Sequence, residues 1–147
     1  METAVTMNIA LRFDTEGVDW TNAAEVFEKA PLGTREPDVL RRTFENSGLT
    51  CFAWRGETLV GLGRALSDGV AHSVIYDLCM IPECQGQGLG TRMMEAMLER
   101  LNTPNVVLWS VPGKEPFYAR FGFNPMRTAM ARLENPERSA AQGYITL

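Results

Sequence analysis

The stretch Glu83-Cys84-Gln85-Gly86-Gln87-Gly88-Leu89-Gly90 decides how this sequence is read, because it joins a strand-like segment to a strongly amphipathic one. Glycines let a backbone bend sharply and approach a ligand without Cβ atoms in the way. The backbone N–H groups at a helix start lack intrahelical partners, and the helix dipole adds positive potential there. A strand, a glycine-rich turn and a helix therefore indicate a site for a phosphate or pyrophosphate.

Three kinds of anion-binding loop compete for this stretch. A P-loop ends in Gly-Lys-Ser/Thr, whereas Gly88-Leu89-Gly90-Thr91 has no lysine. A dinucleotide fingerprint needs GxGxxG, and the last glycine of Gly86-Gln87-Gly88-Leu89-Gly90 comes one position too early. The pattern Gln/Arg-x-x-Gly-x-Gly/Ala is matched at every fixed position by Gln85, Gly88 and Gly90. A glycine-rich turn without a ligand is the simplest alternative.

The segments before the loop predict an antiparallel meander. Turn signals separate three consecutive strand-like runs, which are Leu49–Arg55, Thr58–Leu66 and Val70–Ile81. An earlier strand is expected at Asn8–Phe13. Two short helices should follow it, one at Ala23–Lys29 after capping side chains and one that begins at Glu36-Pro37-Asp38.

After the loop, the apolar residues repeat with a helical period of 3.6. The apolar stripe consists of Leu89, Met93, Met94, Met97, Leu98 and Leu101. This stripe is typical of core packing rather than of a special binding surface. A short buried strand, Asn105–Val111, should then run parallel to the strand before the helix, because a crossover helix joins the two. Lys114–Arg120 fits a short helix, a final strand is expected from Phe123, and Pro136–Leu147 is either a docked extension or a loose tail.

Composition indicates one ordinary globular domain over residues 1–147. The net charge of −4 and the absence of a Lys/Arg block argue against a nucleic-acid or anionic-membrane surface. No apolar run approaches the roughly 20 residues that span a bilayer, and Met1–Thr6 does not have the pattern of a signal peptide. Three cysteines without metal-ligand spacing indicate reduced thiols, a cytoplasmic protein and no metal site.

Two motifs in their expected structural places resemble the Gcn5-related N-acetyltransferase (GNAT) superfamily. Leu78-Cys79-Met80-Ile81-Pro82 and the glycine loop are similar to the strand end and acetyl-coenzyme A loop of that family. Pro116-Phe117-Tyr118-Ala119-Arg120-Phe121-Gly122-Phe123 resembles its later Phe-Tyr-x-x-x-Gly-Phe segment. The order of elements agrees over residues 7–133. Within the superfamily, the pair is most similar to small-amine acetyltransferases, including the arylalkylamine type.

The resemblance implies an α/β (α+β) fold with a mixed, mostly antiparallel sheet of about six to seven strands and about four flanking helices. A splayed pair of strands would hold acetyl-coenzyme A as cosubstrate, and Asn105–Ser110 would be the strand that splays away. The backbone N–H groups of Gln85, Gly86, Gln87, Gly88, Leu89 and Gly90 would bind the pyrophosphate. The backbones of Leu78, Cys79 and Met80 would hydrogen-bond the pantetheine arm. Homodimers are common in this superfamily, so a homodimer is compatible with the resemblance.

Tyr118 and Asp77 are the catalytic candidates. Acetyl transfer needs a neutral amine, a polarised thioester carbonyl and a proton for the leaving thiolate. The resemblance implies that the phenol of Tyr118 also contacts the acyl sulfur and protonates the thiolate; the alternative is a packed aromatic side chain. By alternation, Tyr76, Leu78 and Met80 share one side of their strand and Asp77 the other, unless the bulge that the family carries there shifts the pattern. Asp77 is expected either to accept the proton of the amine or to be an ordinary salt-bridge partner.

Other side chains are weaker candidates. His72 has a suitable pKa for a base but lies far from the loop along its strand. Aromatic residues that either line an acceptor pocket or belong to the core are Trp20, Phe27, Phe52, Trp54 and Tyr76. The sequence therefore predicts an acetyl-coenzyme A-dependent N-acetyltransferase that acts on a primary amine, with a non-catalytic acyl-coenzyme A sensor on the same fold as the alternative.

Overall fold

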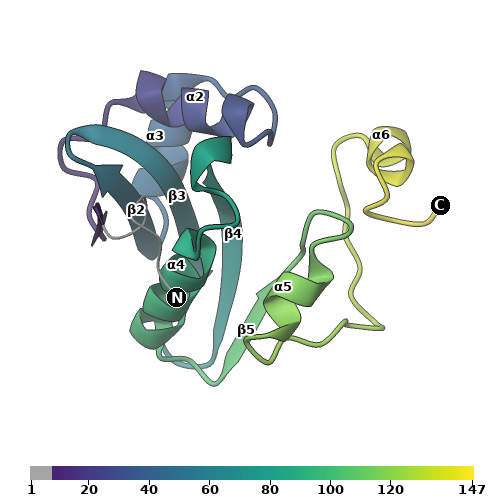
Figure 1. Cartoon of the computed structure of the whole chain (residues 1–147). Helices are drawn as coiled ribbons and strands as arrows, with labels where there is room; N and C mark the ends of the chain where they lie inside the picture. Colours follow the sequence, from purple (N-terminus) through teal and green to yellow (C-terminus); the bar gives the residue numbers. More distant parts are fainter. Residues whose placement is uncertain (1–7) are drawn as a thin grey trace. The chain divides into compact units, whose positions relative to one another are not determined.

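The computed structural model describes residues 8–147, so Met1–Thr6, where no signal peptide is expected, lies outside the described residues. The chain divides into two compact units, one that ends at Val107 and one that runs from Leu108 to Leu147 (Figure 1). Each unit is described by itself. The single domain over residues 1–147 stays a prediction.

A five-stranded sheet forms the centre of the first unit. Its strands lie in chain order: β1 (Ile9–Arg12), β2 (Leu49–Arg55), β3 (Thr58–Ser67), β4 (His72–Met80) and β5 (Asn105–Leu108). The first four strands pair antiparallel with their neighbours, which confirms the predicted meander. The crossover helix α4 leads to β5 beside β4, where the backbone N–H of Asn105 donates to the carbonyl of Ala71 at 3.1 Å.

Helices α2 (Trp20–Lys29) and α3 (Pro37–Glu45) pack on one face of this sheet (Figure 1). The carboxylate of Asp19 caps α2 by accepting from the N–H groups of Thr21 and Asn22. Three aromatic rings join the layers, with centroids 5.5 to 6.1 Å apart: Trp20, Phe44 and Phe52. Phe27 and Phe52 are fully buried, so these two predicted pocket walls belong to the core.

Helix α4 (Leu89–Leu101) covers the opposite face. A Cβ atom on Gly63 would lie only 3.3 Å from the Sδ atom of Met97, so the glycine in β3 eases the close approach of the helix. The predicted apolar stripe of α4 is confirmed for Leu89, Met93, Met94, Met97 and Leu101, which are buried, whereas Leu98 is only half-buried. The layers are thus two helices, a sheet and one helix.

The second unit corrects part of the prediction. It contains α5 (Glu115–Ala119) and α6 (Pro136–Ala141), and residues 123–135 form neither a strand nor a helix. The strand expected from Phe123 is wrong, because Pro125 two residues later removes a backbone donor and restricts Asn124. Residues 8–147 therefore form five strands rather than six to seven, and five α-helices rather than four.

The C-terminal segment also differs from a loose tail. The side chain of Asn135 accepts from the N–H of Arg138 and caps α6, which begins with Pro136 in its first turn. Among the described residues, no helix is long and apolar enough to cross a membrane.

Candidate functional site

The glycine loop is shaped by a 3₁₀ turn on one side and by two left-handed glycines on the other. The turn η1 (Pro82–Cys84) is closed by hydrogen bonds from the N–H of Cys84 to Ile81 and from the N–H of Gln85 to Pro82, both 3.0 Å. Gly86 and Gly88 follow with φ of 70° and 89°, a conformation that residues with a Cβ rarely adopt. Gly88 is the cap residue from which α4 starts.

A row of five consecutive N–H groups is left at the start of α4. Among residues 8–147, no acceptor pairs with the backbone N–H of Gly86, Gln87, Gly88, Leu89 or Gly90. A Cβ atom on Gly86 would meet no other residue within 4 Å, so there is open space beside Gly86. The fully buried Leu89 side chain anchors the helix start in the core. This arrangement suits the oxygens of a pyrophosphate.

Gln85 supports the glycine loop through its side chain, whereas its backbone N–H was expected to bind the pyrophosphate. Its backbone N–H already donates to the carbonyl of Pro82, so it is not available to a ligand in this structure. Its side-chain Nε2 donates to the carbonyls of Ala30 at 2.9 Å and Met80 at 3.0 Å. Gln85 therefore fastens the loop to the end of α2 and to the end of β4. The sequence pattern marked this position, but not its distant partner Ala30, directly after α2.

Strand β4 carries a β-bulge at Asp77 and Leu78, which locates the irregularity that the sequence could not place. Leu62 pairs with Cys79, and Arg64, two residues on, pairs with Tyr76, so β4 holds one extra residue. Asp77 has φ of 62°, in the left-handed region that favours glycine. Of the predicted pantetheine-binding residues, Leu78 lies in the bulge, and Cys79 and Met80 follow it in regular pairing.

The carboxylate of Asp77 lies between two arginines. Its Oδ2 accepts from Nε of Arg64 at 2.7 Å, and its Oδ1 lies 3.5 Å from a guanidinium nitrogen of Arg35. The side chains of Asp77 and Arg64 are only 13% and 15% exposed. An amine's proton would have to compete with two guanidinium groups for these oxygens. The salt-bridge alternative thus describes the geometry, and the base role of Asp77 stays a prediction.

The bulge also changes which side chains share a face of β4. Arg64 lies 4.8 Å from the ring centre of Tyr76 and pairs with Asp77, so Tyr76 and Asp77 lie on the same side. Placing Tyr76 with Leu78 by simple alternation is therefore wrong, because one extra residue reverses the parity. The side chain of Leu78 instead lies beside Gly63, on the face of the sheet that α4 covers.

The three cysteines are buried and free. Burial raises the pKa of Cys51 to about 12, and it also raises the pKa values of Cys79 and Cys84. A thiolate nucleophile is disfavoured in these places. Within residues 8–147, no group of three or more His, Cys, Asp or Glu side chains is placed to hold a metal ion. His72 is exposed at the start of β4, away from the loop in sequence.

Tyr118 belongs to the second unit. It lies in α5, is half-buried, and packs edge-on against Phe117 and Phe123 with ring centroids 5.0 and 6.2 Å apart. The loop and β4 lie together in the first unit. The other predicted site residues all lie in the first unit, on β4 and on the loop that follows it. The catalytic role of Tyr118 stays a prediction.

Comparison with known sequences extends this description. The family described as an acetyltransferase (GNAT) domain matches residues 12–132, which run across both units. Serotonin N-acetyltransferase 2, chloroplastic, of Oryza sativa subsp. japonica is 31% identical over 121 residues, covering 78% of this chain and 60% of the relative. GCN5-related N-acetyltransferase 1, chloroplastic, of Arabidopsis thaliana is 29% identical over 118 residues, covering 77% and 60%. The chain thus spans about three fifths of the length of these relatives.

Solved structures share the fold. A structure from Deinococcus radiodurans R1 aligns with a TM-score of 0.79 and 25% identity over the whole of both chains. A GNAT-family acetyltransferase from Streptococcus pneumoniae TIGR4 aligns with a TM-score of 0.73 and 22% identity, over 87% of this chain and 98% of the other. The second likeness is a likeness of fold alone.

Proposed function

Because the chain belongs to the GNAT acetyltransferase domain family, we propose that it transfers an acetyl group from acetyl-coenzyme A to a primary amine. The observation that carries this proposal is the row of N–H groups from Gly86 to Gly90 at the start of α4, which have no acceptor among residues 8–147, with open space beside Gly86. Such a row binds a pyrophosphate through the backbone, without needing basic side chains. This agrees with a loop that contains no lysine or arginine.

The residues next to the loop fit the rest of the coenzyme. The pantetheine arm is an extended chain with two amides, and it can pair with strand backbone as an added strand would. Leu78, Cys79 and Met80 offer such backbone directly before the loop, and the bulge at Asp77 interrupts regular pairing there. Since only main-chain atoms are used, the buried thiol of Cys79 serves packing.

The chemistry is a direct transfer. The lone pair of the neutral amine attacks the thioester carbonyl carbon, the C–S bond breaks, the amine loses a proton, and the thiolate gains one. We assign the second proton to the phenol of Tyr118. Asp77 is the proposed acceptor of the first proton or, through its contacts with Arg64 and Arg35, the group that fixes the bulge.

A small amine is the proposed acceptor. The rice relative is named for serotonin, an arylalkylamine, and it supports this class by similarity. The net charge of −4 is compatible with a cationic amine but does not select one. The cytoplasmic location and the homodimer stay predictions.

One assay tests the proposal. The protein is incubated with acetyl-coenzyme A and a panel of arylalkylamines, polyamines and amino-terminal peptides, and free thiol is followed over time. Release that depends on an arylalkylamine supports the enzyme. Tight binding of coenzyme A by calorimetry without turnover on any amine would favour the sensor instead. Failure to bind coenzyme A at all would contradict both.

A further inference from the structure

Arg64 reaches the carboxylate of Asp77 in the first unit, at the point where β4 leaves regular pairing. Its Nε donates to Oδ2 of Asp77 at 2.7 Å, and both side chains are largely buried. Its Nη1 donates to the hydroxyl of Ser47 at 3.4 Å, and its guanidinium lies over the ring of Tyr76. Arg35 approaches the same carboxylate at 3.5 Å from the segment before α3. Arg64 is therefore held in one place by three neighbours.

The backbone of Asp77 has a conformation that needs support from its surroundings. Its φ of 62° lies in the left-handed region, which a Cβ atom disfavours even though aspartate tolerates it better than most residues. In a regular strand Asp77 would lie on the opposite face from Tyr76, and its carboxylate would be out of reach of Arg64. The ion pair is thus made only in the bulged strand, so it favours the bulge.

The position of the bulge decides which main-chain groups of β4 are open to a ligand. In an antiparallel ladder, alternate residues bond to one neighbouring strand, and the residues between them present their N–H and C=O groups to the other edge. Leu62 pairs with Cys79 and Arg64 pairs with Tyr76, so the extra residue lies between these two pairs. Loss of the bulge would reverse this order over residues 78–80, where the pantetheine arm is proposed to bind.

We propose that Arg64 is a positioning residue for coenzyme A, and that it acts through Asp77. Arg64 holds the carboxylate of Asp77 on one face of the sheet, which keeps the bulge in place. The bulge in turn fixes which main-chain groups of residues 78–80 face the coenzyme. This inference rests on the proposed acetyl-coenzyme A site. Arg64 itself contacts neither the coenzyme nor the amine.

Alanine and glycine at position 77 separate the bulge from the charge. Asp77→Ala and Asp77→Gly both remove the carboxylate, so they leave Arg64 and Arg35 equally unpaired. Only alanine disfavours the left-handed conformation. In calorimetric titrations of the full chain, Asp77→Ala should bind coenzyme A about fivefold to thirtyfold more weakly than Asp77→Gly, which is the cost of that conformation expressed as an affinity. Equal affinities would overturn the proposal.

Arg64→Gln tests whether the arginine acts through Asp77. In the parent chain it should raise the Kd for coenzyme A about fivefold or more, because the bulge loses its support. In the Asp77→Gly chain the same change should alter the Kd by no more than about twofold, since glycine adopts the bulge without an ion pair. Equal losses in both chains would show that Arg64 does not act through Asp77, and would contradict the proposal.

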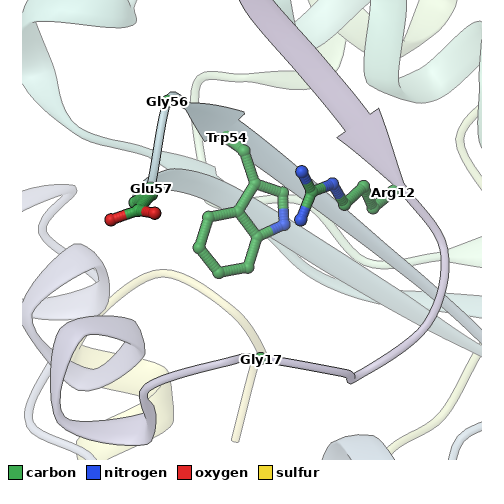
Figure 2. Close-up of a pocket in the computed structure, with 5 residues that line it drawn as sticks. All are labelled: Arg12, Gly17, Trp54, Gly56 and Glu57. Carbon is green, nitrogen blue, oxygen red and sulfur yellow. The ribbon is translucent and has the colours of Figure 1, made fainter.

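Arg12 supplies a matched control on the same sheet. It lines a pocket with Gly17, Trp54, Gly56 and Glu57, and Figure 2 shows its guanidinium beside the indole of Trp54. The guanidinium carbon lies 5.5 Å from the centre of that ring, much as Arg64 lies 4.8 Å from the ring of Tyr76. Within residues 8–147, Arg12 has no carboxylate partner. Arg12→Gln should therefore leave the Kd for coenzyme A unchanged.

The backbone carbon chemical shifts of Asp77 report the bulge without any ligand. They should have left-handed values in the parent chain and move toward extended values in Arg64→Gln. Unchanged shifts in Arg64→Gln would overturn the positioning role, even if the parent chain binds coenzyme A and transfers acetyl groups. A parent chain that has the left-handed shifts but binds no coenzyme A would instead contradict the proposed function. The two failures are thus distinguishable.

Discussion

Replacing Gly86 with alanine separates the backbone role of the glycine loop from its proposed ligand role. Gly86 has φ of 70°, and no other residue lies within 4 Å of a Cβ atom placed there. The only cost to the folded state is therefore the left-handed backbone conformation, which destabilises an alanine by roughly 1 to 2 kcal/mol. The stiffer unfolded chain offsets about 0.4 to 1 kcal/mol of this cost. We expect Gly86→Ala to lose about 1 kcal/mol of unfolding free energy, or roughly 2 to 4 °C in Tm.

Gly69 is a matched control in the turn between β3 and β4. Its φ is 73°, and a Cβ atom there also meets no other residue within 4 Å. Gly69→Ala should thus cost the same stability as Gly86→Ala. Only Gly86→Ala places a methyl group in the space where the pyrophosphate is proposed to bind.

The two variants should differ in coenzyme A affinity. Displacing the phosphate from one charge-assisted N–H contact costs about 1.5 to 3 kcal/mol, which corresponds to roughly a tenfold to hundredfold higher Kd. Calorimetric titration well below Tm measures this difference, and thermal unfolding measures the shared loss of stability. Equal coenzyme A affinities in the two alanine variants would refute the assignment of the loop as the pyrophosphate site.

Four further results are expected. Tyr118→Phe should slow acetyl transfer by about 10² to 10⁴-fold with unchanged coenzyme A binding; equal single-turnover rates would remove Tyr118 as the acid. Asp77→Asn should lower unfolding free energy by about 3 kcal/mol in a denaturant titration, because two guanidinium groups lose their carboxylate; an unaltered midpoint would contradict the ion-pair geometry. The N–H groups of three successive residues donate to the carboxylate of Asp68 and lower its pKa. The ionised carboxylate therefore stabilises the fold at a pH above the ordinary pKa of an aspartate. This stabilisation is lost as the pH falls through the lowered pKa of the folded state. Asp68→Asn should therefore lower Tm at neutral pH, by an amount that shrinks in acid; a pH-independent difference would argue against this. Burial raises the pKa of Cys51 to about 12, so a thiol reagent at pH 8 should modify Cys51 only on unfolding, whereas rapid labelling of the native chain would be inconsistent with its burial.

Local patterns predicted most of the first unit. The stripe from Leu89 to Leu101 follows the helical period, and the turns at Gly56 and Gly69 separate strands of opposite direction, so neighbouring residues carry the information. The open N–H groups of the loop follow from the same local reasoning, because a helix start has unpaired donors whatever surrounds it.

The remaining features depend on partners distant in sequence. Alternation counts residues, and it cannot show where the extra residue at Asp77 is inserted, since that depends on the register with β3. Arg64 was missed as the partner of Asp77 for the same reason. The strand expected from Phe123 failed because a local apolar pattern says nothing about a neighbouring strand to pair with, and Pro125 weakens that pairing.

The contacts of Gln85 have a consequence for variation at this position. One amide group holds the carbonyl of Ala30 after α2 and that of Met80 at the end of β4. A shorter side chain would lose both hydrogen bonds at once. The position of the glycine loop is therefore coupled to the position of the end of α2. By thermodynamic reciprocity, a ligand that stabilises the attached loop also stabilises the attached helix end, and the converse holds with the same coupling energy.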